Sequence, residues 1–239
     1  MSETMRQTVE IVFNISYLLV VWSLVFLMAV RQPHVAARQR PLAIRLLWAF
    51  ALLALGDTGH VGFRVIAYAR GGLETNPALV GIGALSTAVT VTIFYMILVD
   101  VWRLRFSRPI GWLGWALLGA GIIRLLVMAF PQNNWEQTVA PYEWSLLRNA
   151  FLVIQGVGVM ALMLRDAARA HDRTFTWIGI MIACSYLFYA PVILFAASFP
   201  ILGMLMIPKT CAYVAVAVIA YRAFYPAPSR TAAEPAPAV

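Results

Sequence analysis

The sequence predicts an all-α polytopic membrane protein, a seven-transmembrane-helix bundle with its N-terminus outside and its C-terminus in the cytoplasm. Three observations support this fold class. Of the 239 residues, 62% are hydrophobic and 12% are charged, whereas about a quarter of the residues in an ordinary soluble domain are charged. Seven apolar segments each approach the roughly 20 residues that a helix needs to cross a bilayer. Finally, the arginines gather in alternate connections between these segments.

Each apolar segment is predicted to form one helix. The first follows the stretch MSETMRQTVE, which carries two acids and one base, and its apolar run is too long for a cleaved signal peptide. Glycine and proline within several segments do not argue against helices, because transmembrane helices tolerate both. In chain order, the predicted ranges are about 10–30, 42–68, 78–102, 110–130, 144–164, 174–197 and 200–224.

The chain is predicted to contain one folded domain and a short tail. Residues 1–225 form the seven-helix transmembrane domain. Residues 226–239 read PAPSRTAAEPAPAV, and this Pro/Ala-rich composition is typical of a disordered segment, here on the cytoplasmic side. Cys184 and Cys211 fall within predicted helices, and their spacing does not resemble a disulfide pair or a zinc-binding motif.

Arginine placement predicts the orientation of the bundle. Bases are concentrated after the first, third and fifth segments, whereas the alternate connections collect glutamates. By the positive-inside rule, the arginine-rich connections face the cytoplasm, as expected for a multi-pass protein of the cell (inner) membrane. The formal net charge of +8 follows from this asymmetry, so we predict membrane lipids and no nucleic acid as partners. The bases are Arg31, Arg38, Arg40 and Arg45; Arg103, Arg105 and Arg108; and Arg165, Arg169 and Arg173.

An unexpected polar stretch, LGDTGHVGFR, interrupts the second apolar segment. Asp57, His60 and Arg64 stand at positions i, i+3 and i+7, so a helix places them on one stripe. Ionisable groups at membrane depth cost several kcal/mol unless partners, water or a ligand compensate them. The stretch therefore predicts a functional or structural polar site within the bundle.

Further polar residues are predicted to lie at a similar depth. Asp57 opposes four bases, Arg64, Arg124, Arg148 and Lys209, which leaves a formal excess of three positive charges (four minus one). This excess predicts an outward-facing, partly wet cavity that binds a small anionic or amphipathic molecule, for sensing, binding or transport. We expect Asp57 to contact Lys209, or Arg148 through His60. The predicted ligand-binding residues are Arg64, Arg124, Asn133, Asn134, Arg148, Asn149, Gln155 and Lys209, with the two loop asparagines closing the mouth.

Three other interpretations compete with ligand binding. Asp57 and His60 are the candidate catalytic acid–base pair of an intramembrane enzyme acting on a lipid-like substrate. Lys209, the only lysine, is a candidate Schiff-base residue for retinal, although only Asp57 could serve as counter-ion; we otherwise predict no cofactor. Ion pairing that merely locks helices together is the structural alternative. A histidine-based metal site is not expected, because His34 and His171 lie in the arginine-rich connections, away from His60.

Five motifs resemble those of a family of uncharacterised bacterial seven-helix integral membrane proteins. They are GDTGHVGFR, TIFYM, PQNNW, the Arg148–Asn149 pair and MIPKTCAY, and together they span the second to the seventh segment. The resemblance implies a shared polar set without implying a reaction. That set comprises Asp57, His60, Arg64, Asn133, Asn134, Trp135, Arg148, Asn149 and Lys209.

Overall fold

A computed structural model describes residues 3–196 and 198–226. Within them, seven helices are long and apolar enough to cross a membrane, and no strand is present. The predicted helical fold is therefore confirmed for this part of the chain. The helices are α1 (Glu3–Arg31), α2 (Arg40–Ala69), α3 (Pro77–Phe106), α4 (Trp112–Ala129), α5 (Tyr142–Ala170), α6 (Arg173–Phe195) and α7 (Met206–Phe224).

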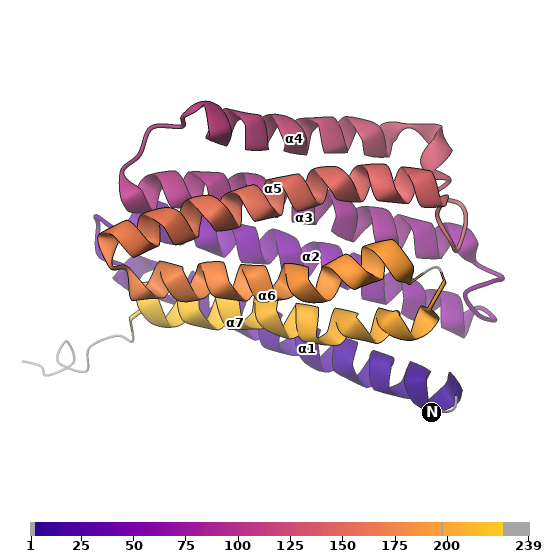
Figure 1. Cartoon of the computed structure of the whole chain (residues 1–239). Coiled ribbons are helices and arrows are strands. Elements are labelled where there is room, and N and C mark those ends of the chain that lie inside the picture. The colour runs from indigo at the N-terminus through magenta and orange to yellow at the C-terminus, as the bar shows by residue number, and fades with distance from the viewer. Residues whose placement is uncertain (1–2, 197, 227–239) are drawn as a thin grey trace, which may run out of the picture.

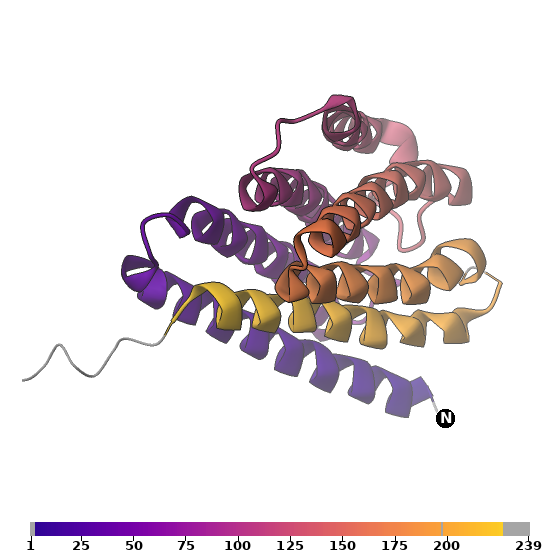
Figure 2. The same ribbon diagram turned by 60° about the vertical axis from the view of Figure 1, so that its left-hand side comes forward.

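The helices lie side by side in one bundle (Figure 1). Consecutive helices pack against each other from α1 to α7, and α1 also packs against α7. Helix α4 contacts only its neighbours α3 and α5 extensively and therefore lies at the periphery, as Figure 2 also shows. We call the end with connections 70–76, 130–141 and 196–205 the cavity end, and the end with connections 32–39, 107–111 and 171–172 the arginine-rich end.

The seventh apolar segment differs from the prediction of a single α-helix. Its first six residues, Pro200–Leu205, form the 3₁₀-helix η3, and the α-helix begins at Met206. The tighter 3₁₀ winding advances farther per residue than α-helical winding. Lys209 consequently lies in the first turn of α7, although it is well inside the apolar span Ile201–Phe224. The predicted disordered tail falls outside the described residues, apart from Pro226.

Small residues bring α2 and α3 unusually close together. A Cβ atom on Gly56 would lie 1.8 Å from the Thr90 hydroxyl oxygen and 3.1 Å from the Ser86 carbonyl oxygen. One turn later, a Cβ on Gly59 would lie 2.4 Å from the Ser86 hydroxyl oxygen. Close backbone approach through such residues is a common way for membrane helices to associate. This contact fixes the rotation of α2 and hence the direction of Asp57 and His60.

Gly56→Ala is expected to lower the stability of the bundle by about 1–3 kcal/mol, as overpacking of a tight contact usually does. Gly62→Ala on the same helix is the matched control, because its Cβ would meet nothing within 4 Å. Both changes raise helix propensity equally. Melting temperatures of the detergent-solubilised variants measure the difference. Equal melting temperatures for the two variants would contradict the close packing of α2 on α3.

Aspartates pair with arginines at the arginine-rich end. Asp100 accepts hydrogen bonds from Arg45 at 2.9 Å and from Arg103 at 2.7 Å. Asp172 pairs with Arg105 at 2.7 Å, and its other oxygen accepts the backbone N–H of Phe175 at the start of α6. Carboxylates thus offset part of the positive charge at this end.

Candidate functional site

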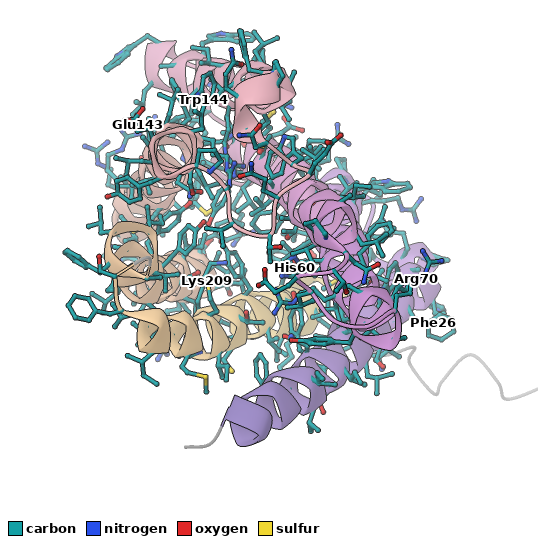
Figure 3. All side chains as sticks on the ribbon, turned by 90° about the vertical axis from the view of Figure 1, so that its right-hand side faces the viewer. Phe26, His60, Arg70, Glu143, Trp144 and Lys209 are labelled. Atoms are coloured by element: carbon teal, nitrogen blue, oxygen red, sulfur yellow. The ribbon has the colours of Figure 1, made fainter. Side chains whose placement is uncertain are left out.

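A cavity of about 600 Å³ lies inside the cavity end of the bundle. All seven helices contribute to its wall, as do η3 and the connection between α4 and α5. Viewed from this end, Lys209 and His60 lie toward the middle of the bundle, whereas Phe26 lies at its edge (Figure 3). The volume falls within the roughly 300–1,000 Å³ of typical ligand pockets.

Most of the predicted site residues are brought together on this wall. Four of the lining residues are basic and one is acidic, so among the described residues the wall carries the predicted formal excess of three positive charges. The predicted residues that line the cavity are Asp57, His60, Arg64, Arg124, Arg148, Asn149 and Lys209. They come from four different helices, α2, α4, α5 and α7.

 Helix α3 also takes part in the site, through Thr87, a lining residue outside the predicted set whose hydroxyl donates a hydrogen bond to Asp57.

Asp57 is held by two neutral hydroxyl groups from neighbouring helices. Its Oδ2 accepts a hydrogen bond from the Tyr17 hydroxyl of α1, and its Oδ1 accepts one from the Thr87 hydroxyl of α3, both at 2.6 Å. Asp57 therefore joins α1, α2 and α3 on one side of the cavity. Because both partners are neutral, these contacts leave its negative charge available to offset the surrounding bases.

Lys209 lies between the faces of two aromatic rings. Its Nζ is 4.6 Å from the centre of the Tyr189 ring and 5.3 Å from that of Tyr213, distances at which cation–π attraction operates. In the described part of the chain, Lys209 makes no salt bridge and no side-chain hydrogen bond. The direct Asp57–Lys209 contact expected from the sequence is thus not found. The Schiff-base interpretation of Lys209 stays a prediction.

Arg124 connects three helices at the cavity wall. The side chain is 2% exposed, so it does not extend outward from α4. Its guanidinium donates hydrogen bonds to the Arg148 carbonyl oxygen of α5 at 2.9 Å and to the Ala88 carbonyl oxygen of α3 at 2.8 Å. It also donates to the Thr92 hydroxyl. These neutral acceptors stabilise the position of the guanidinium without neutralising its charge.

Arg148 attaches α5 to the connection between α4 and α5. Its guanidinium lies 4.5 Å from the centre of the Trp135 ring and donates a hydrogen bond to Asn133 Oδ1 at 3.1 Å. Asn133 is fully buried and donates to the Val127 and Phe130 carbonyl oxygens at the end of α4. The connection is thereby fixed against the helices that it joins, and Arg148 is positioned by it.

The remaining predicted ligand-binding residues do not line the cavity. Asn133 and Gln155 are buried behind the wall, and Gln155 donates to the Thr92 carbonyl oxygen at 3.4 Å. Asn134 is exposed in the connection, in the left-handed conformation with φ of 47°. The residue of this connection that lines the cavity is instead Trp135. Ligand contacts by the two asparagines stay a prediction.

Sequence reasoning missed two aromatic residues of the wall. Tyr17 and Tyr213 both line the cavity, yet tyrosine is frequent near membrane surfaces, and its presence in a sequence does not indicate a site. For Tyr17 a signal existed, because it stands three residues after Asn14 and both line the cavity. Such spacing places two polar groups on one face of an otherwise apolar helix.

Comparisons with known protein families, curated proteins and solved structures found no match. The resemblance suggested by the GDTGHVGFR and MIPKTCAY motifs stays a prediction.

Proposed function

We propose that this protein is a multi-pass membrane protein that binds a small molecule carrying a carboxylate or phosphate group. The binding site is the cavity, and Lys209, Arg148 and Arg64 are the residues that meet the negative group. Three basic side chains of the wall, Arg124, Arg148 and Lys209, make no salt bridge among the described residues. They support an anionic ligand, because several like charges in a confined space are unfavourable until a counter-charge binds.

The arrangement of Lys209 is the observation that carries this proposal. Its ammonium group lies on the cavity wall against two aromatic rings, with no carboxylate paired to it among the described residues. An ammonium group has three hydrogen-bond donors. A bound oxyanion would satisfy these donors and bring a negative charge into direct contact with the ammonium group at the same time.

Anion binding predicts a specific stabilisation of the purified protein. Acetate and inorganic phosphate should raise its melting temperature in a saturable manner, since a ligand that binds only the folded state stabilises it by RT ln(1 + [L]/Kd). Sodium chloride at matched ionic strength is the control for general screening. Native mass spectrometry of the untreated protein would identify a retained ligand. Equal melting curves with chloride, acetate and phosphate would contradict the proposal.

We further propose that the cavity end faces the outside and the arginine-rich end the cytoplasm, in the cell (inner) membrane. Gln137 and Gln39 are both exposed, one in a connection at each end. In a variant without Cys184 and Cys211, a membrane-impermeant thiol reagent added to intact cells should label Gln137→Cys and spare Gln39→Cys. After the membrane is opened, both should react. The reverse labelling pattern in intact cells would show that the bundle has the opposite orientation in the membrane.

A further inference from the structure

We propose that the ligand is an amphiphile that enters the cavity sideways from the lipid, between α1 and the η3–α7 segment. Its carboxylate or phosphate head group binds at Lys209, and its hydrocarbon chain lies along the apolar part of the wall. This inference rests on the proposed anion-binding function and specifies the class of ligand and its route.

The cavity wall combines charged groups with an apolar region formed by α1, η3 and the start of α7. The bases and Asp57 are supplied by α2, α4, α5 and the first turn of α7. Phe13 of α1, Met204 of η3, and Met206 and Ile207 of α7 line the cavity with hydrocarbon and thioether groups. A ligand that satisfies both has a charged head and an apolar chain.

The size of the cavity also favours an amphiphile over a small inorganic anion. Its volume is about 600 Å³, which corresponds to about 20 water molecules at roughly 30 Å³ each. An acetate or phosphate ion bound at Lys209 would leave most of this space, including the apolar region, filled only with water. A hydrocarbon chain would cover the apolar region and exclude that water.

The cavity wall reaches the surface of the bundle at η3 and the start of α7. Gly203 and Met206 both line the cavity and are exposed, Met206 by 37%. The exposed large side chains nearest to them along the chain are Phe199 and Ile201, at 60% and 63%. Apolar residues around an opening within an apolar span indicate contact with lipid, because a water-facing opening would favour a polar rim.

Helix α1 and the η3–α7 segment both contribute apolar residues to the cavity wall. In Figures 1, 2 and 3, the N-terminal half of α1 diverges from α7 toward the cavity end. Phe13 and Asn14 of this half line the cavity, and the adjacent Val12 is 59% exposed. The side of the bundle where α1 and η3–α7 meet the cavity therefore carries apolar side chains on both elements, and we place the entry route there.

Access along the bundle axis is restricted by the connection between α4 and α5. Trp135 of this connection lines the cavity, and its indole N–H donates to the Met128 carbonyl oxygen at 3.0 Å. Its own carbonyl oxygen lies only 1.5 Å from where a Cβ on Gly81 would stand, so the connection lies directly against α3. Trp135 is thus packed between α3, α4 and Arg148, and covers this side of the cavity.

A photoreactive fatty acid tests the inference. The protein is placed in phosphatidylcholine nanodiscs with dodecanoate that carries a diazirine near its terminal methyl group, and labelled residues are mapped by mass spectrometry. We expect label on Phe13, Met204 or Ile207. An excess of unlabelled dodecanoate or dodecyl phosphate should reduce this label at least tenfold, whereas acetate or inorganic phosphate at the same concentration should not.

Two variants, each with a control, test separately the contact of the head group with Lys209 and the entry route past Met206. Lys209→Met should reduce label on the cavity residues at least tenfold and leave label on Leu126, which is 60% exposed on α4, unchanged. Met206→Trp should slow cavity labelling, whereas Ile122→Trp on the exposed surface of α4 should not. Label confined to exposed residues such as Leu126, or equal displacement by acetate and dodecanoate, would overturn the inference. If acetate and phosphate still stabilise the protein in that case, the anion-binding function stands without the amphiphile.

Discussion

Lys209→Met is expected to weaken anion binding about 10- to 100-fold, because a hydrogen bond to a charged group contributes about 1.5–3 kcal/mol. Methionine retains most of the length of the side chain and its contact with the Tyr189 and Tyr213 rings, since thioethers also pack well against aromatic groups. The substitution therefore removes the charge with little change in packing. The readout is the shift in melting temperature with acetate or phosphate.

The same variant is expected to retain or exceed the stability of the wild-type protein when no ligand is present. Removing a cation that lacks a salt bridge among the described residues relieves a desolvation cost, which offsets the lost cation–π attraction of about 0.5–2 kcal/mol. Arg70→Met is the control, because Arg70 is exposed at the same end of the bundle. A Lys209→Met protein that melts much earlier yet still responds to acetate would show that Lys209 serves packing alone.

The helical architecture could be predicted because the membrane constrains it so strongly. Every backbone polar group in hydrocarbon needs a partner within the segment, so a sufficiently long apolar run implies a helix. The start of the seventh segment is the exception. Residues 200–205 are as apolar as the α-helical residues that follow them. The sequence pattern therefore does not distinguish the 3₁₀-helix that the structure has there from an α-helix.

The composition of the site could be predicted better than its contacts. Polar residues in apolar segments are conspicuous, so Asp57, Arg124, Arg148 and Lys209 stand out, and all four line one cavity. Which of them touch depends on helix rotation and on differences in depth of a few ångströms, which a one-dimensional pattern does not contain. Asp57 therefore binds hydroxyl groups rather than the expected Lys209.

Arg124 illustrates the same difficulty in another way. From the sequence, a long basic side chain in the half of α4 nearer the cavity end could extend toward the membrane surface. The structure instead buries it against the Ala88 and Arg148 carbonyl oxygens. These two acceptors are backbone atoms, which every residue has, and the third is the Thr92 hydroxyl. Because α3 carries several other hydroxyl groups, the sequence does not mark Thr92 as the partner of Arg124.

Asp57→Asn is expected to lower the stability of the ligand-free protein by about 1–3 kcal/mol. The carboxylate accepts hydrogen bonds from both Tyr17 and Thr87, whereas an amide offers one acceptor oxygen and places an N–H₂ group toward the other hydroxyl. The substitution also removes the one acidic side chain among the described lining residues. Without this negative charge, the mutual repulsion among the basic lining residues Arg64, Arg124, Arg148 and Lys209 is compensated less.

The same loss of negative charge is expected to strengthen anion binding about tenfold, which corresponds to about 1.4 kcal/mol. Opposite effects on stability and affinity distinguish this prediction from simple damage to the fold, which would weaken both. Glu136→Gln is the matched control, because Glu136 is exposed in the connection at the cavity end and its loss changes the net charge equally. Melting temperatures measured without ligand and across an acetate titration report both quantities. If Asp57→Asn weakened acetate binding as well as stability, Asp57 would be a residue that shapes the cavity rather than one that balances its charge.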